Sequence, residues 1–264
     1  MALSAKYAGA NSGRGVSPGI WSDCPWLEIL NDNNIGFGIH DEFLNVGATT
    51  APYQYVGDAS PAFLGLDTDD YNGGVIRAPI TNTDNNEAYM ASGNDTGVLG
   101  AIDTLANAGR KTWFEARIRS SYITDMGLYL GLAEAGFVAA NALVDNTGDL
   151  ADGSIIGFHR PAGASELLDF VYGTNGTAHT IGKADIWTPA ADTWVKLGLK
   201  YDPKIGIYAY VNGVLVTPDP ILASATNFPD GEGMLFAFGA KTGTATAINL
   251  DADWWRFAQL SNPQ

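Results

Sequence analysis

The chain has few features that could cross-link it or attract a nucleic acid. Cys24 is its only cysteine, so no disulfide can form within the chain and the fold must be held by core packing. Only 14 of the 264 residues are Lys or Arg, against 29 Asp and Glu, which gives a net charge of -15. The basic residues are scattered, without the stripe needed to neutralise phosphates. We therefore expect no nucleic acid and no anionic membrane as a partner.

Long apolar runs are missing from the sequence as well. The opening residues, MALSAKYAGANSGRG, contain no apolar stretch after Lys6, which predicts that the chain carries no secretory signal. No run elsewhere reaches membrane-spanning length. Hydrophobic residues still make up 46% of the chain and charged residues only 16%, so there is ample apolar surface for a core. We expect one globular body of a size that a single large domain can reach.

Residues 1–36 are rich in Gly, Ser, Asn and Ala and show no strand or helix period. Aromatic residues in this stretch need cover from water, which predicts an extended N-terminal arm that lies against its own body or a neighbouring subunit. The alternative is a disordered leader. If the arm contacts a partner, the residues that we expect to make the contact are Lys6, Tyr7, Arg14, Trp21 and Trp26.

Residues 37–264 show the two-residue period of half-buried strands. In residues 111–119, apolar side chains alternate with Glu and Arg, and residues 194–201 alternate in the same way, which places Lys196 and Lys200 in water. Further strands are predicted at residues 126–133, 167–172, 205–211, 214–216, 234–240 and 254–260. No amphipathic helix is evident, and the strands are separated by turn-forming residues. This pattern predicts an all-β antiparallel sandwich or jelly roll, preceded by the arm.

A hairpin signal stands at Asn212-Gly213, where both residues tolerate the positive φ of a type I′ turn. The flanking strands read TWVKLGLKYD and IYAYVNG. Together with WFEAR at 113–117, DWWRF at 253–257 and DEF at 41–43, these segments resemble the strands of laminin-G-like and concanavalin A-like domains. The resemblance implies a concanavalin A-like jelly roll over roughly residues 37–260.

This resemblance leaves the function open, because the fold hosts lectins, glucanases, adhesion modules and virion proteins. The chain resembles the capsid decoration, or cement, proteins of tailed bacteriophages in overall composition and organisation, because it has no signal, no disulfides and a loose arm. This predicts a virion structural protein on the capsid exterior that binds the major capsid protein and its own copies, as a homotrimer. The alternative is a carbohydrate-binding, lectin-like module or a receptor-binding phage domain.

Catalytic patterns are missing from the sequence. Retaining glucanases of this fold carry a Glu-x-Asp-x-(x)-Glu strand, because two carboxylates about 5 Å apart must flank the bond to be cleaved. Glu166 and Asp169, three positions apart, would point to opposite faces of a strand. His40, His159 and His179 stand in no metal-ligand or hydrolase spacing. We therefore predict that the chain is not an enzyme and has no catalytic or cofactor-binding residues.

Two kinds of ligand contact stay open as alternatives. The clusters Asp67–Asp70 and Asp84–Glu87 offer the oxygen atoms that calcium prefers, although Asp and Asn are also the usual residues of turns. Tyr208 and Tyr210 share one face of a strand, where they could contact a sugar or pack against the arm or a second subunit.

The pair Trp254-Trp255 is a further candidate for an aromatic surface. Adjacent residues of a strand point to opposite faces of the sheet. We therefore expect at most one of the two rings to reach a ligand and the other to lie in the core.

Overall fold

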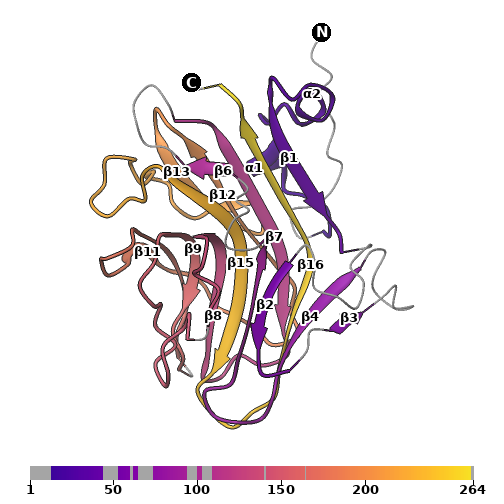
Figure 1. Ribbon diagram of the computed structural model, residues 1–264, viewed down its shortest axis with the longest axis vertical. Helices are drawn as coiled ribbons and strands as arrows, with labels where there is room; N and C mark the ends of the chain where they lie inside the picture. Colours follow the sequence, from indigo (N-terminus) through magenta and orange to yellow (C-terminus); the bar gives the residue numbers. More distant parts are fainter. Residues whose placement is uncertain are drawn as a thin grey trace.

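In the computed structural model, the chain forms two antiparallel β-sheets that pack face to face (Figure 1). Two short helices, α1 (Pro18–Trp21) and α2 (Trp26–Asn31), precede the strands. No helix in the described part of the chain is both long and apolar enough to cross a membrane. The structure describes residues 13–43, 53–59, 62–64, 74–93, 100–102, 109–139, 141–163 and 165–262.

Sheet A contains eight strands in the order β14-β13-β12-β7-β16-β4-β3, with β1 also paired to β16. The long C-terminal strand β16 therefore lies inside the sheet and crosses much of the molecule (Figure 1). The strands of sheet A are β1 (Gly36–Asp41), β3 (Ala62–Leu64), β4 (Val75–Ile80), β7 (Thr112–Ser120), β12 (Val195–Asp202), β13 (Gly206–Val211), β14 (Val214–Leu215) and β16 (Ile248–Leu260).

Sheet B also contains eight strands, in the order β11-β10-β9-β8-β15-β5-β2, with β6 paired to β15. Every strand pairing in it is antiparallel, as in sheet A. Its strands are β2 (Tyr53–Gly57), β5 (Glu87–Ser92), β6 (Gly100–Ile102), β8 (Met126–Glu134), β9 (Ile155–Arg160), β10 (Leu168–Gly173), β11 (Thr180–Trp187) and β15 (Glu232–Thr242).

The main core lies between the two sheets and consists of the inward side chains of both. Trp255 from β16 stacks on Phe236 from β15, with ring centroids 5.0 Å apart, and Phe236 stacks in turn on Phe238. Trp254 points to the opposite face of sheet A, as the parity of the strand requires. The predicted all-β antiparallel sandwich and the separation of the two tryptophans are confirmed.

The predicted hairpin at Asn212-Gly213 is confirmed as well. Val211 pairs with Val214, so two residues form the turn, and their φ angles are 50° for Asn212 and 74° for Gly213. The Asn212 side chain also accepts a hydrogen bond from the backbone N–H of Lys196, at 3.0 Å. The turn is thereby tied to the neighbouring strand β12.

The described part of the N-terminal arm, residues 13–36, lies on the outer face of sheet A. It packs there through Ile20, Trp21 and Ile29, all nearly inaccessible to water, in a second apolar cluster. Docking of the arm on its own body is therefore confirmed for these residues. The prediction of an extended conformation is wrong here, because both short helices lie in this stretch. Lys6 and Tyr7 lie outside the described residues.

The arm also changes the environment of sheet A. Lys196 was expected in water, yet only 2% of it is exposed, and Glu115 on the same outer face is fully buried. The prediction for Lys196 is wrong because the arm covers the face that the period-two pattern assigns to solvent.

The outer face of sheet B is covered in turn by residues 135–139 and 141–154. Phe137, Leu143 and Leu150 from this segment pack on outward side chains of the sheet, among them Tyr89 and Tyr129. The backbone N–H of Leu143 donates to the Tyr89 hydroxyl at 3.0 Å. Both broad faces of the sandwich are therefore largely occupied by the chain itself.

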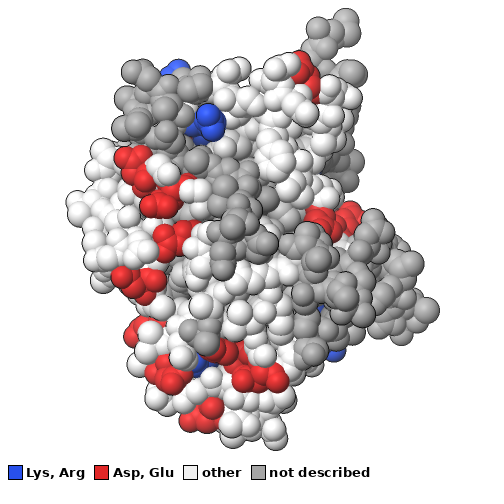
Figure 2. All heavy atoms as spheres, in the orientation of Figure 1, with Lys and Arg blue, Asp and Glu red and all other residues white. Residues whose placement is uncertain are grey.

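Acidic side chains are spread over the face of the molecule in Figure 2, with few basic ones among them. This distribution agrees with the net charge of -15. A polyanion would be repelled by such a face.

The turn at Gly213 provides a test of the hairpin. In Gly213→Val, a β-branched residue must adopt a φ of 74°, so we expect a loss of roughly 1 to 3 kcal/mol in the free energy of unfolding. Gly15→Val is the control, because a Cβ at Gly15 meets no atom within 4 Å. Denaturant unfolding measures both variants, and equal stabilities would contradict the turn geometry.

Candidate functional site

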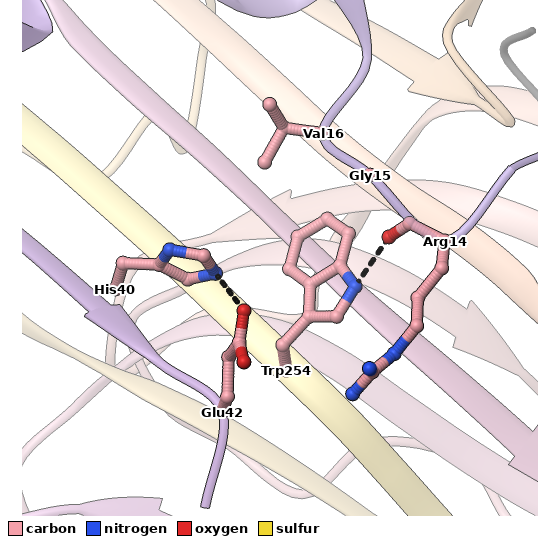
Figure 3. A pocket seen from close by; sticks show the side chains of 6 residues that line it. All are labelled: Arg14, Gly15, Val16, His40, Glu42 and Trp254. Carbon is pink, nitrogen blue, oxygen red and sulfur yellow. Dashed lines mark hydrogen bonds and ion pairs between the residues drawn. The ribbon is translucent and has the colours of Figure 1, made fainter. Parts of the chain in front are cut away.

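A pocket of about 230 Å³ opens where the arm meets sheet A (Figure 3). Figure 3 shows Trp254 between His40 on one side and Arg14 on the other. The pocket is lined by Arg14, Gly15, Val16, His40, Glu42 and Trp254.

A β-bulge in β16 creates this site. The pairing of β16 with β7 shifts between Ala252 and Trp254, which leaves Asp253 as the extra residue. On the other side of β16, β4 pairs up to Ala252 and β1 begins to pair at Trp255. The bulge therefore lies between two partner strands, and it directs Asp253 and Trp254 in succession to the outer face.

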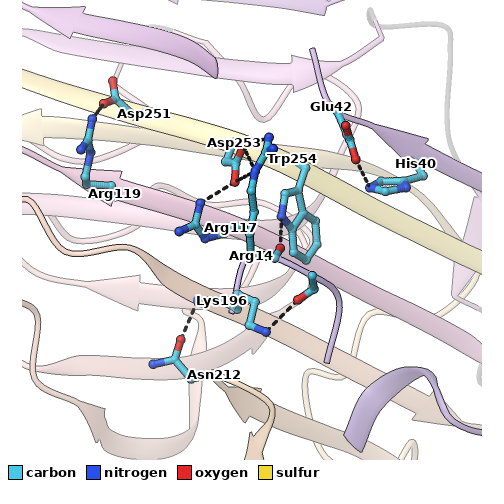
Figure 4. Close-up of polar contacts among 11 residues, drawn as sticks. Arg14, His40, Glu42, Arg117, Arg119, Lys196, Asn212, Asp251, Asp253 and Trp254 are labelled. Atoms are coloured by element: carbon cyan, nitrogen blue, oxygen red, sulfur yellow. Dashed lines mark hydrogen bonds and ion pairs between the residues drawn. The ribbon is translucent and has the colours of Figure 1, made fainter. Parts of the chain in front are cut away.

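Asp253 binds the arm to sheet A through two arginines (Figure 4). Arg14 Nε lies 2.8 Å from one carboxylate oxygen and Nη2 lies 2.5 Å from the other, while Arg117 Nη1 donates at 2.5 Å. The Asp253 side chain is fully buried. The hydrogen bond to Asp253 raises the pKa of Arg14, whereas burial lowers the pKa of Arg117. A carboxylate between two cations in this geometry is fully neutralised.

Trp254 forms the floor of the pocket. Its indole Nε1 donates to the backbone carbonyl of Arg14 at 2.7 Å, and its ring meets His40 edge-on at a centroid distance of 6.0 Å. Only 2% of the residue is exposed. The indole therefore offers a small apolar contact and no broad stacking surface.

His40 and Glu42 form the outer rim of the pocket. His40 Nε2 lies 3.7 Å from Glu42 Oε1, and 38% of the Glu42 side chain is exposed. Burial first, and the nearby charge of Arg256 second, lower the pKa of His40, so the imidazole is neutral at pH 7. Among the described residues His40 is the only polar partner of the Glu42 carboxylate, which leaves acceptor oxygens for a ligand.

The arm residues that line the pocket, 14–16, are held in place by hydrogen bonds with two charged side chains of sheet A that lie outside the pocket. Glu115 Oε2 accepts the backbone N–H of Ser17 and the indole N–H of Trp21, each at 2.9 Å. Lys196 Nζ donates to the carbonyl of Gly15 at 2.8 Å (Figure 4). Burial raises the pKa of Glu115 and lowers the pKa of Lys196. These contacts fix residues 15–21 on sheet A.

Arg14 is the one predicted arm residue that lines the pocket. Trp21 and Trp26, also predicted as partner contacts, instead pack edge-to-face on each other and against Arg256, whose guanidinium carbon is 4.6 and 3.5 Å from the two ring centroids. Tyr210 is buried under the arm and Tyr208 packs beside it, so packing against the arm is the observed alternative for these tyrosines.

His40, Glu42 and Trp254 were not predicted as one site. His40 and Trp254 come from strands adjacent in space, and Glu42 directly follows β1. One sequence feature pointed to this site: the alternation of side chains in a strand predicted that only one ring of Trp254-Trp255 could reach a ligand.

The two acidic clusters considered as calcium ligands, residues 67–70 and 84–87, differ in what the structure describes of them. Residues 67–70 lie outside the described residues. In the second cluster, Glu87 is already bound by Lys241 at 2.8 Å, by the Tyr89 hydroxyl and by the backbone N–H of Asn141. Within the described ranges, no three His, Cys, Asp or Glu side chains are gathered in a way that could hold a metal ion.

The other two histidines meet at sheet B, whereas the pocket lies on sheet A. His159 and His179 contact edge-to-face at 5.5 Å, and a ring nitrogen of His159 lies 2.8 Å from the carbonyl of Gly148. Burial lowers the pKa of His159 to about 4. Both side chains contribute to packing under the segment that covers sheet B.

No protein-family model matches this sequence, and no curated protein matches it. Solved structures do match it. Peanut lectin, solved with a nine-residue peptide, has a TM-score of 0.58 at 15% identity, over 84% of this chain and 97% of its own. Basic winged bean lectin, solved with Tn-antigen, has a TM-score of 0.53 at 9% identity, and the match covers 86% of this chain and 100% of the lectin chain. A Bacteroides ovatus glycoside hydrolase of family 16, solved with a G4G4G3G product, has a TM-score of 0.55 at 13% identity, and the match covers 83% of this chain and 99% of the hydrolase chain.

These similarities show the fold, which is a concanavalin A-like β-sandwich as the sequence resemblance implied. They give no support to the virion hypothesis, because none of these structures is a capsid component. The homotrimer, the capsid partner and the location on a virion stay predictions.

The Asp253 contact can be tested by substitution. Asp253→Asn leaves Arg14 and Arg117 without their shared counterion, so we expect the free energy of unfolding to fall by about 3 kcal/mol. Asp23→Asn is the control, because the Asp23–Lys200 pair is partly exposed and should contribute under about 1 kcal/mol. Chemical denaturation compares the two variants, and similar losses would show that burial of Asp253 is unimportant.

A second test follows from the pKa of His159. Its folded value of about 4 lies below the unfolded value of about 6.5, so its contribution is complete above pH 6.5 and is lost as the pH falls toward 4. Relative to His159→Gln, the wild-type protein should lose about 3 kcal/mol of stability between pH 7 and pH 4. Unfolding curves at several pH values measure this difference, and a constant difference would refute it.

Proposed function

We propose that this protein binds a neutral sugar residue in the pocket between the arm and sheet A, and that it does not cleave its ligand. The observation that carries the proposal is the chemistry of the lining: a rim carboxylate whose one polar side-chain partner among the described residues is His40, a neutral imidazole, a guanidinium and the edge of an indole. Hydroxyl groups of a sugar both donate and accept hydrogen bonds, so they suit such a mixed set.

The size and charge of the pocket limit the class of ligand that it can bind. A volume of about 230 Å³ is below the roughly 300 to 1,000 Å³ of pockets for drug-sized ligands, which favours one sugar ring over a long chain. Asp253 offsets one of the two positive charges of Arg14 and Arg117, and Glu42 carries a negative charge on the rim. An anionic sugar would face Glu42, so a neutral hexose is preferred. The lectin-like fold supports the proposal as an analogy.

Binding without hydrolysis is favoured by the carboxylates near the site. Glycoside hydrolysis requires two carboxyl groups that flank the scissile bond. Among the described residues Glu42 is the single carboxylate that lines the pocket, and Asp253 is buried beneath two arginines. Incubation with β-glucans should therefore release no reducing sugar.

The binding proposal is tested with D-glucose, D-galactose, D-mannose and N-acetyl-D-glucosamine, followed by protein-observed NMR. We expect at least one of them to bind with a Kd on the order of 1 mM, about -4 kcal/mol, because the pocket is small and open. Glu42→Gln should weaken this binding about tenfold, since a charged acceptor is lost.

The matched control is Asp84→Asn, which removes an exposed carboxylate from a turn outside the pocket and should leave the Kd unchanged. Shifts that map to other parts of the surface, or binding that Glu42→Gln leaves intact, would contradict this site.

A further inference from the structure

The two walls of the pocket come from parts of the chain that are far apart in sequence. Arg14, Gly15 and Val16 form the arm wall, while His40, Glu42 and Trp254 belong to β1, its following loop and β16. Without residues 14–16 of the arm, the remaining groups would stand on an open part of the outer face of sheet A. The pocket therefore exists in the docked state of the arm.

The first described residues of the arm bury little apolar surface. Gly13 and Gly15 are exposed, and Arg14 and Val16 are half-buried, in contrast to the fully buried Ile20 further on. Segments with few buried apolar contacts open locally at low free-energy cost. Residues 13–17 are thus held mainly by polar contacts.

Desolvation of charge works against these polar contacts. Under the docked arm Glu115 is completely buried and Lys196 is 2% exposed. Glu115 Oε2 accepts from Ser17 and Trp21 and Lys196 donates to Gly15, whereas the buried Glu115 Oε1 has no hydrogen-bond partner among the described residues. Withdrawal of buried charges from water offsets much of what such bonds contribute. The docked and undocked states of residues 13–17 should therefore differ by a free energy that a bound ligand can shift.

We infer that docking of residues 13–17 of the arm and binding of a hexose in the pocket are thermodynamically coupled, so that the arm regulates access to the site. This inference rests on the proposed function. A hexose that needs both walls binds the docked state alone, and it must stabilise docking to the same extent that undocking weakens its binding. Glu115 and Lys196 control the affinity although neither lines the pocket.

Hydrogen exchange of the Ser17 amide reports docking directly, because this N–H donates to Glu115 from within the arm. At a hexose concentration ten times its Kd, we expect Ser17 exchange in the wild-type protein to slow about elevenfold. The Leu143 amide is the matched control, since it donates to the Tyr89 side chain on the opposite sheet and should be unaffected. The four hexoses named above serve as probes.

A variant tests the reverse direction of the coupling. Glu115→Ala removes both of its hydrogen bonds to the arm, so the docked state should be destabilised and the hexose Kd should rise at least tenfold. Glu87→Ala is its control, because Glu87 is a buried carboxylate on sheet B, 8% exposed, that touches neither the arm nor the pocket, and it should leave the Kd unchanged. The wild-type exchange measurement needs no variant, so a failure of Glu115→Ala to fold leaves the inference open to refutation.

The outcomes separate this inference from the proposed function. Slowing of Ser17 alone, with a weakened Kd in Glu115→Ala, supports the coupling. If a hexose binds through Glu42 but Ser17 exchange stays constant, or slows together with Leu143, the coupling is wrong and the sugar site stands. If Glu115→Ala folds yet keeps the wild-type Kd, the coupling is also wrong. If no hexose binds, both proposals fail.

Discussion

The buried carboxylate of Asp253 is the interaction on which the site depends. It occupies a bulge in β16, between the ends of two partner strands, and it is neutralised by Arg14 from the arm and Arg117 from β7. Without a counterion, a charge buried to this extent would be strongly unfavourable. Arg117 supplies a counterion from within the sheet, and Arg14 fixes the arm, which forms one wall of the pocket, to the same carboxylate.

Coverage of the two broad faces decides where a ligand can reach the sandwich. The arm lies on the outer face of sheet A, and residues 135–139 and 141–154 lie on the outer face of sheet B. The pocket opens where the first of these covers ends, next to His40 and Trp254. In this concanavalin A-like sandwich the polar groups of the pocket therefore lie beside the arm.

Predictions from the sequence succeeded where neighbouring residues act on one another. The alternation in residues 111–119 and 194–201 predicted β7 and β12, and Asn212-Gly213 predicted the turn before β14, because strand period and turn conformation are local properties. The same alternation wrongly placed Lys196 in water. Parity assigns a side chain to a face of the sheet, but it carries no information on what covers that face.

The sequence by itself determined the all-β sandwich, its hairpin and the inward position of one tryptophan from the pair at 254 and 255. Only the tertiary structure decided the site, since Arg14 meets Asp253 across a separation of 239 residues and His40 meets Trp254 across adjacent strands. Such contacts depend on strand order, on the bulge in β16 and on the path of the arm. These features arise from packing and desolvation of the whole chain, so no local pattern of residues specifies them.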